Sequence, residues 1–419
     1  MRVIVEVDRS GPVRSFAEPT PLVNLPILHG GNPSGLRRRL GLGEAPWLDF
    51  ATVVNPVGTP PRAIEVARNA LDRADRHPDP GCPALVDALA ERHGVPANRV
   101  LIGAGVTELM GLLGQSLREV LAFHAQAIGD PSRPLSHLVD PSDPRYRLIS
   151  KHNELRAKVW GEHVLGWRQD TLPKEANGLF WSGHPDNPTG KAWDRATLTK
   201  FAIDTLGLLT VVDESSLPFL ADEAERTLVA DAARLENLLV LRSFSGYFAL
   251  PGLRVGYAIG PPDMVTRLRQ YQDPWSVTAH AEAAALAALA DTEHAEKTRD
   301  WMATEAPRFV ERLWDVPGLR PAWPDRNRPS TAPPLPPTAL VSLTQTDWDS
   351  ISLQEALARR GFLVRECSDF PGLEVGALLT GPDQLVATRG HLRLAIRDRL
   401  DNDRLVDELI RLLASGPET

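Results

Sequence analysis

The chain has 419 residues, of which 42% are hydrophobic and 24% charged, and its formal net charge is -8 at pH 7. These values are typical of a soluble globular protein and exclude a disordered, collagen-like or coiled-coil chain. No apolar run approaches the roughly 18 residues of a membrane span, and the acidic balance without a basic cluster argues against a nucleic-acid partner.

The N-terminal segment has no secretion signal that we recognise. It interrupts its apolar stretch with Glu6 and Asp8 and offers no small-residue cleavage site, so we expect a cytoplasmic location. Cys82 and Cys367 are the two cysteines, and their wide separation fits neither a disulfide framework nor a zinc site. We therefore expect two buried or half-buried thiols and no metal.

The first half of the chain begins irregularly and then becomes helical. Residues 1–60 read as an arm with one strand. From residue 62, RAIEVARNALDRA carries apolar residues at helical spacing, and a second helix, ALVDALAERHG, ends at Gly94. An apolar run at 100–102 then meets a glycine turn at 103–105 and a helix that opens at Thr107, and this order is typical of phosphate-binding loops.

Short apolar runs alternate with helical stretches through the middle of the chain. They cover residues 136–139, 179–181, 208–212, 238–241 and 255–259. This alternation predicts an α/β domain with a largely parallel sheet.

The last third predicts a smaller α+β domain. Residues 280–300, rich in alanine with charge pairs at i,i+4, predict one helix that links the two domains. The proline-rich residues 317–337 predict a loop. Beyond it we expect further elements, namely strands at 339–343, 362–365 and 391–396, a helix at 353–360 and a final helix from 401.

Three further stretches carry polar groups suited to chemistry. HPDNPTG, residues 184–190, directly follows a predicted strand. VVDESS places Asp213 at the end of another predicted strand, where a buried carboxylate needs a cation or a hydrogen-bond donor. In RSFSGYFALPGLRVGY, two hydroxyls and a guanidinium could close around a phosphate, those of Ser243, Ser245 and Arg254.

In this order, the stretches resemble the fold type I aminotransferase superfamily, in its histidinol-phosphate aminotransferase and threonine-phosphate decarboxylase branch. The resemblance covers nearly the whole chain from residue 28, and further segments carry it: HGGN at 29–32, DFATVVNPVG at 49–58, RHPDPGCPAL at 76–85, DPWSV at 273–277, RECSDFPGL at 365–373 and HLRLAIRDRLDNDRL at 391–405.

The resemblance implies an α/β fold with a large domain around a mixed, mostly parallel seven-stranded sheet. A small α+β domain would be built from both chain termini. We place an N-terminal arm and part of the small domain at 1–60, the large domain at 61–285 and the small C-terminal domain at 286–419. The resemblance also implies a homodimer with its ligand sites at the subunit interface.

The family uses pyridoxal 5'-phosphate (PLP), and matching positions imply roles. The backbone of Gly105, Val106 and Thr107 would hold the phosphate, with Ser243, Ser245 and Arg254 completing the cup. Asp213 would pair with the pyridine nitrogen, and Asn187 would donate to the ring hydroxyl. Three further residues match the cofactor site: Tyr146, Ser216 and His77. Substrate contacts are implied for four residues: His29, Val53, Arg365 and Arg393.

One position departs from the family in a way that bears on the chemistry. The Schiff-base lysine is expected eight residues before the phosphate arginine, and that position is Gly246. No lysine occurs between Lys200 and Lys297. We therefore expect PLP or pyridoxamine 5'-phosphate to bind without a covalent bond.

Other departures surround the same position. Ser216 and His77 stand where the family has tyrosines, and His77 would reach the partner subunit's phosphate. His184 and Val53 stand where it has asparagines. Asp143 takes the register of the ring-stacking aromatic, while Tyr146 is kept.

Three hypotheses stay open. The first is an enzyme acting on an amino acid or amino-acid phosphate with a non-covalently bound cofactor or cofactor adduct; water, Tyr247 or His184 would move protons. Ordinary transamination should be very slow, because losing a positioned proton carrier costs about 10²–10⁴ in rate.

The second hypothesis is a catalytically silent homologue that serves as a ligand-binding, regulatory or structural partner. The third is a pocket rebuilt for another phosphorylated small molecule, with Asp143 and Ser216 as polar contacts. The retained Arg393 favours an enzyme, because a scaffold needs no carboxylate clamp.

Overall fold

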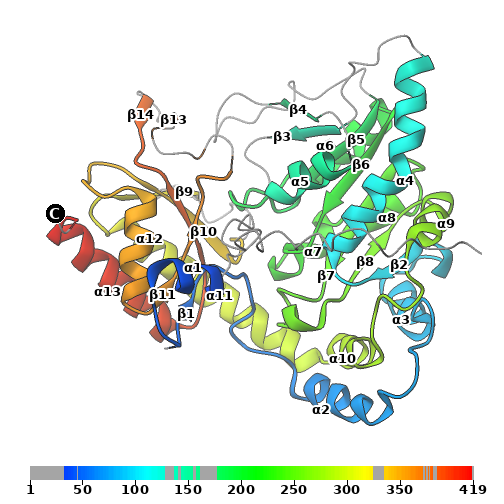
Figure 1. Ribbon diagram of the computed structural model, residues 1–419, viewed down its shortest axis with the longest axis horizontal. Coiled ribbons are helices and arrows are strands. Elements are labelled where there is room, and N and C mark those ends of the chain that lie inside the picture. Colours follow the sequence, from blue (N-terminus) through cyan, green and yellow to red (C-terminus); the bar gives the residue numbers. More distant parts are fainter. Residues whose placement is uncertain are drawn as a thin grey trace, which may run out of the picture.

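The computed structural model describes residues 33–44, 46–127, 136–139, 143–153, 157–160, 177–323, 335–370, 373, 376, 378–380 and 385–417. A large lobe surrounds a twisted sheet, and a smaller lobe lies beside it (Figure 1). The long helix α11 (Thr292–Trp314) runs between the two lobes.

The large lobe is built on a seven-stranded sheet. Its order is β2, β8, β7, β6, β5, β3, β4, and β8 is antiparallel to both of its neighbours while the remaining pairs are parallel. The predicted mixed, mostly parallel sheet is therefore confirmed. The strand bounds are β2 Val100–Gly103, β3 Ser136–Val139, β4 Ala157–Trp160, β5 Gly178–Gly183, β6 Leu208–Asp213, β7 Leu238–Ser243 and β8 Gly256–Ile259. The sequence did not predict β4.

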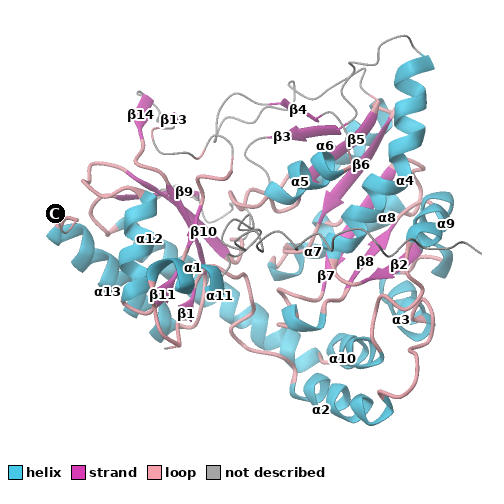
Figure 2. Cartoon of the chain, in the orientation of Figure 1, coloured by secondary structure: helices cyan, strands magenta, loops and turns pink. Residues whose placement is uncertain are grey.

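Helices cover both faces of this sheet (Figure 2). The inner strands β5 and β6 are buried along their whole length, as expected for parallel strands between helical layers. The helix bounds are α2 Pro61–Ala70, α3 Pro83–His93, α4 Val106–Ala127, α5 Pro144–His152, α6 Arg195–Asp204, α7 Glu223–Arg226, α8 Val229–Ala232, α9 Pro262–Tyr271 and α10 Ala279–Leu289.

The helix predicted at 280–300 is in fact two helices. α10 ends at Leu289, and α11 begins at Thr292. Asp291 caps the second helix, because its Oδ1 accepts a hydrogen bond of 2.9 Å from the backbone N–H of His294. α10 packs against α2, and the predicted domain boundary at residue 285 falls within it, so the boundaries stay predictions.

The small lobe joins both ends of the described chain. Its main sheet has the order β12, β15, β10, β9, with all pairs antiparallel. β1 pairs in parallel with β11 and thereby connects the N-terminal segment to this lobe. The bounds are α1 Pro33–Leu40, β1 Leu48–Asp49, β9 Leu319–Trp323, β10 Thr338–Leu343, α12 Ser350–Arg359, β11 Phe362–Leu363, β12 Arg365–Glu366, β13 Leu378–Thr380, β14 Leu385–Ala387, β15 His391–Ala395 and α13 Arg399–Ser415.

The prediction of a loop over residues 317–337 is partly wrong. Residues 319–323 form β9, which pairs with β10. Residues 324–334 lie outside the described residues.

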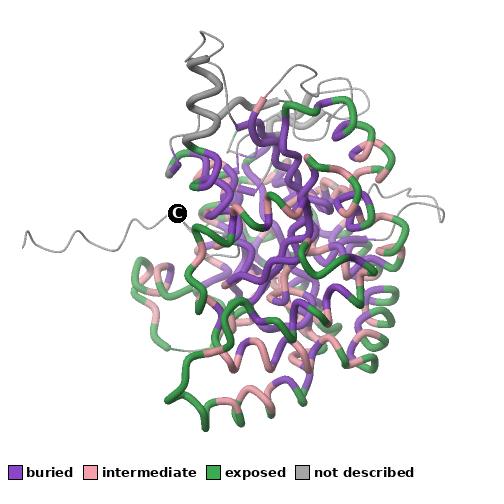
Figure 3. The backbone as a smooth tube through the Cα atoms, turned by 90° about the vertical axis from the view of Figure 1, so that its right-hand side faces the viewer, coloured by how far each residue is buried: buried purple, intermediate pink, exposed green. Residues whose placement is uncertain are grey.

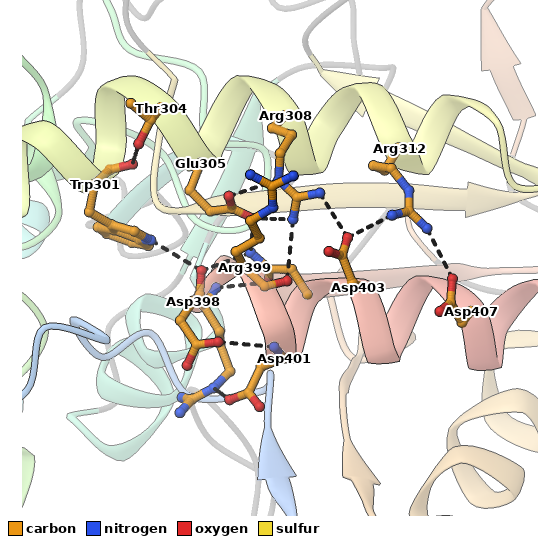
Figure 4. Close-up of polar contacts among 12 residues, drawn as sticks. Trp301, Thr304, Glu305, Arg308, Arg312, Asp398, Arg399, Asp401, Asp403 and Asp407 are labelled. Atoms are coloured by element: carbon orange, nitrogen blue, oxygen red, sulfur yellow. Dashed lines mark hydrogen bonds and ion pairs between the residues drawn. The ribbon is translucent and has the colours of Figure 1, made fainter.

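Ion pairs hold α13 against α11 (Figure 4). Asp403 accepts hydrogen bonds from Arg308 at 2.7 Å and from Arg312 at 2.6 Å. Glu305 accepts from Arg308 at 2.6 Å and from Asn402 at 2.8 Å. Single half-exposed pairs contribute about 0–1 kcal/mol each, so the stabilisation comes from the network as a whole.

Buried residues run through the interior of the molecule, and exposed residues lie mostly on its outer segments (Figure 3). Cys82 is 2% exposed and Cys367 is fully buried, and both are free thiols, as the sequence predicted. Burial raises the pKa of each thiol to about 12. In the described ranges, the helices lack the combination of length and apolar character that spanning a bilayer requires.

Candidate ligand site at the carboxyl edge of the large sheet

The parallel strands bring several predicted site residues to one edge of the large sheet. Gly183 at the end of β5 pairs in register with Asp213 at the end of β6, and β7 ends beside them at Ser243. A cavity of about 190 Å³ opens at this edge, between the large lobe and the start of β10. The predicted site residues that line it are Val53, Val106, Thr107, Asn187, Ser216, Ser243, Ser245, Gly246, Arg254 and Arg393.

One end of the cavity is suited to a phosphate. The turn before α4 places Gly105 at φ +80°, and a Cβ atom there would lie 2.5 Å from Nη2 of Arg254. The left-handed backbone at this position favours glycine, and the guanidinium lies close against it. The first N–H groups of α4 have no acceptor within the helix, and the helix dipole favours an anion beside them.

The serines complete this phosphate end. The backbone N–H of Ser245 donates to Oγ of Ser243 at 3.0 Å, and Arg254 donates to Oγ of Ser245 at 3.5 Å and to the carbonyl of Pro251 at 3.2 Å. Arg254 is exposed, so its guanidinium can turn toward an incoming anion. We call the group formed by the start of α4, Ser243, Ser245 and Arg254 the phosphate cup.

At the opposite end, Arg145 joins two carboxylates. Its Nη2 donates to Oδ2 of Asp143 at 2.9 Å and to Oδ2 of Asp213 at 3.0 Å, and its Nε donates to Oδ1 of Asp143 at 3.0 Å. The other oxygen of Asp213 accepts from the backbone and hydroxyl of Ser215. Burial by itself would lower the pKa of Arg145, but the two carboxylates outweigh it and hold that pKa above its ordinary value.

Asn187 connects this acidic end to Arg393. Its amide donates to Oδ2 of Asp143 at 2.8 Å, and its oxygen accepts from Nη1 of Arg393. Nη2 of Arg393 donates to the carbonyl of Ala51 at 2.6 Å. Burial, followed by the nearby Arg365 cation, lowers the pKa of Arg393 to about 10, so the guanidinium stays charged at neutral pH.

Gly246, where the family resemblance predicts the lysine, lies in the lining of the same cavity. Asp186 lies in the same lining and accepts a hydrogen bond of 2.8 Å from Oγ1 of Thr189. Burial raises the pKa of Asp186 to about 7, so this carboxyl titrates near neutral pH. The cavity therefore holds cations at fixed charge and one carboxyl whose charge changes with pH.

Two predicted proton carriers face away from the cavity. His184 is fully buried; its Nδ1 accepts from the backbone N–H of Trp193 and its Nε2 donates to the carbonyl of Arg226, both at 3.2 Å. Burial lowers its pKa. The ring of Tyr247 packs edge-on against Phe219 at a centroid distance of 5.3 Å. Packing directs both side chains into the core and neither lines the cavity, so their catalytic roles stay predictions.

Other predicted residues also lie outside the lining formed by the described residues. Tyr146 stacks on Trp181 in the core, with 5.4 Å between ring centroids. Arg365 is buried against Asp369, with Nη2 to carboxylate distances of 2.8 and 2.7 Å. His77 is exposed and stacks on Trp275 at 4.8 Å. His29 lies outside the described residues.

The sequence reasoning missed Arg145 and Asp186. A signal for Arg145 was present, because Asp143 followed by Pro144 is a helix start, and a cation two residues past such a cap can fold back onto it. Asp186 lies within a stretch that was singled out, but its burial could not be known.

The motifs and geometry agree with the comparisons to known proteins. A family model described as "Aminotransferase class I and II" matches residues 169–406, more than half of the chain. The chain belongs to the class I and II aminotransferase family. The branch indicated by the sequence motifs is confirmed by the relatives that follow.

Two relatives span nearly the whole chain. A threonine-phosphate decarboxylase from Salmonella typhimurium is 28% identical over 394 residues, covering 92% of this chain and 96% of that protein. A histidinol-phosphate aminotransferase from Symbiobacterium thermophilum is 30% identical over 402 residues, covering 93% and 97%.

Solved structures support the same fold. The L-threonine-O-3-phosphate decarboxylase from Porphyromonas gingivalis superposes with a TM-score of 0.70 at 21% identity, over 87% of this chain and 99% of that one. The histidinol-phosphate aminotransferase from Sinorhizobium meliloti, solved with pyridoxal-5'-phosphate, has a TM-score of 0.70 at 19% identity, over 96% and 99%. The predicted fold type I architecture is confirmed.

The family is PLP-dependent, and the residues of this member of it fit the cofactor at one end. The phosphate cup is complete. At the end formed by Arg145, Asp143 and Asp213, which we call the ring end, Oδ2 of Asp213 already accepts a hydrogen bond from Nη2 of Arg145. The amide of Asn187 donates to Asp143 rather than standing ready for a ring hydroxyl. The ring end as it stands does not fit pyridoxal phosphate.

Proposed function

We propose that this chain binds a phosphorylated small molecule without a covalent bond, in a pocket rebuilt from that of a PLP-dependent aminotransferase or decarboxylase. One observation carries the proposal: the phosphate cup and Arg393 line the same cavity, whose lining has Gly246 at the position of the family lysine. The phosphate would lie in the cup, as anions do at helix N-termini.

Arg393 supports a second anionic group on the ligand, most simply a carboxylate. Arg393 is 1% exposed, and within the described structure its Nε has no hydrogen-bond partner. A buried donor that lacks an acceptor is costly, and a ligand carboxylate would supply one. The ligand class is therefore a phosphomonoester that carries a carboxylate, to which amino-acid phosphates belong.

A second candidate keeps the cofactor of the family. In it, pyridoxal 5'-phosphate, pyridoxamine 5'-phosphate or an adduct binds non-covalently, and the protein acts on an amino acid or amino-acid phosphate. The retention of Asp213 and Asn187 at the strand ends favours this candidate. The bond between Arg145 and Asp213 opposes it, because that bond must break before a ring nitrogen can reach the carboxylate.

Binding measurements on the full chain separate these candidates. We would measure the thermal shift and calorimetric affinity with inorganic phosphate, threonine phosphate, pyridoxal phosphate and pyridoxamine phosphate. The proposal expects threonine phosphate to bind more tightly than phosphate alone, and Arg254→Gln to weaken both. The absence of any response to every phosphorylated compound would overturn the proposal. If only pyridoxal phosphate and pyridoxamine phosphate bound tightly, the second candidate would be established.

We also propose that the chain forms a homodimer in the cytoplasm. His77 is exposed beside Trp275 rather than lying in the cavity of its own chain, which is consistent with contact to a second subunit. Light scattering after size exclusion should give twice the mass of one chain. A monomer would remove His77 from the proposed site.

A further inference from the structure

Arg145 is held at the ring end by its own helix. Asp143 is the N-cap of α5, and its Oδ1 accepts from the backbone N–H of Arg145 at 2.9 Å. The same carboxylate receives both Nε and Nη2 of the Arg145 side chain. Such two-point contacts between a guanidinium and a carboxylate fix direction as well as distance. The guanidinium is thereby aimed at Asp213.

The contact with Asp213 has little access to solvent. The side chain of Arg145 is 9% exposed, and those of Asp143 and Asp213 are 1% and 7% exposed. Removing one partner from a buried ion pair leaves an uncompensated charge, so the pair resists opening. A cationic ring that approached Asp213 would have to displace a cation that is already bound there.

Asp143 and Arg145 act together at this end. Asp143 takes the register of the aromatic that would stack on a ring, and it is also the anchor of Arg145. By the family resemblance, the chain has at this position a carboxylate that holds the guanidinium, in place of an aromatic side chain. Arg145 itself lines the cavity and donates to Asp213, so its cation already occupies the carboxylate that would pair with a ring nitrogen.

We propose that Arg145 is the specificity-determining residue of this cavity: it blocks Asp213 to a pyridinium ring and leaves the site to open-chain phosphomonoesters. This inference rests on the proposed function, because it concerns which phosphorylated ligands enter the same cavity. It adds that the exclusion of pyridoxal compounds is built by Asp143 and Arg145 and does not follow only from the missing lysine.

The experiment removes the pair while keeping the net charge. In Asp143→Asn with Arg145→Ala, asparagine retains the helix cap and Asp213 becomes free. Affinities for pyridoxal phosphate and pyridoxamine phosphate are measured by fluorescence and calorimetry, and inorganic phosphate is the reference ligand. Asp143→Asn with Arg145→Met is the second variant, because it retains more of the side-chain volume. Lys151→Ala, at an exposed lysine of α5, is the matched control.

We expect the double variants to bind pyridoxal compounds at least about tenfold more tightly than do the unchanged protein and Lys151→Ala. The reason is that the ring no longer has to break a buried ion pair. Phosphate affinity should be the same in all four proteins. Equal affinity for pyridoxal phosphate in all of them, whether weak or tight, overturns the inference. Loss of phosphate binding in all four proteins would instead overturn the proposed function, and the comparison with pyridoxal phosphate would still decide the inference.

Discussion

The carbonyl oxygen of Val53 lies 3.1 Å from the place where a Cβ atom would stand on Gly246. The contact is with the backbone of Val53, and two hydrogen bonds from Asn55 hold this segment against residues 246 and 247. The N–H of Asn55 donates to the carbonyl of Gly246 at 3.0 Å, and its side-chain amide donates to the carbonyl of Tyr247 at 2.8 Å. A Cβ atom added at Gly246 would therefore press on a backbone atom, which would have to shift by a few tenths of an ångström.

We expect Gly246→Ala to destabilise the protein by about 1 kcal/mol, because Val53 cannot yield freely and overpacking outweighs the entropy gained in the unfolded chain. Chemical denaturation measures this difference. Gly252→Ala is the matched control, because no atom lies within 4 Å of a Cβ there. Stabilisation by Gly246→Ala would show that the segment at Val53 moves.

Gly246→Lys alone should not restore covalent attachment of pyridoxal phosphate, since Arg145 still holds Asp213. Borohydride reduction followed by mass spectrometry would detect a trapped adduct at residue 246. We expect an adduct only when Gly246→Lys is combined with the Asp143→Asn and Arg145→Ala changes. An adduct at residue 246 in the single variant would show that the ring end is already open.

Arg393 and Arg254 should affect ligand binding differently. Arg393→Gln should weaken binding of threonine phosphate about tenfold or more and leave inorganic phosphate unaffected, because only the carboxylate contact is lost. Arg254→Gln should weaken both ligands. Calorimetry on the two variants provides the comparison. Equal losses for both ligands in Arg393→Gln would place the phosphate at Arg393 instead of in the cup.

Asp186 should make anion binding depend on pH. Its pKa is raised to about 7, so the carboxyl is mostly neutral below pH 7 and repels an anion above it. Thr189, Lys191 and Asp143 are the other polar groups that act on it. Sulfate is a suitable probe, because it does not titrate in this range. Its affinity should fall about fivefold between pH 6 and 8, as expected for a repulsion of about 1 kcal/mol.

Asp186→Asn should make this profile flat, with sulfate bound at every pH about as tightly as the unchanged protein binds it at pH 6. A profile that keeps its slope in this variant would assign the titration to a different group.

His184 should matter for stability and not for binding. Replacing it with alanine removes the bonds to Trp193 and Arg226 and should lower the free energy of unfolding by about 1–3 kcal/mol. Because its pKa is lowered in the folded state, its contribution is complete above the unfolded value near 6.5 and is lost as pH falls below that value. Denaturation at pH 5 and 8 tests this. Unchanged stability with lost ligand binding would restore His184 to the site.

The sequence alone determined the features that depend on neighbouring residues. The run at 100–102, the glycine turn and the helix at Thr107 define the phosphate end, because a strand, a turn and a helix start are local structures. The family resemblance, together with the spacing from Gly246 to Arg254, predicts a site without the lysine, and this stays a prediction. The alternation of apolar runs with helices likewise predicted the sheet, since the period of a buried pattern requires no knowledge of distant contacts.

Only the tertiary structure decided what the ring end can bind. Arg145 lies 68 residues from Asp213 in sequence, and Arg393 lies 206 residues from Asn187. Arg145 meets Asp213 because α5 follows β3, and β3, β5 and β6 are neighbours in one sheet. Arg393 and Asn187 meet because both line one cavity. Packing also turned His184 and Tyr247 into the core. A side chain's direction depends on which distant surfaces bury it, and no local pattern in the sequence contains that information.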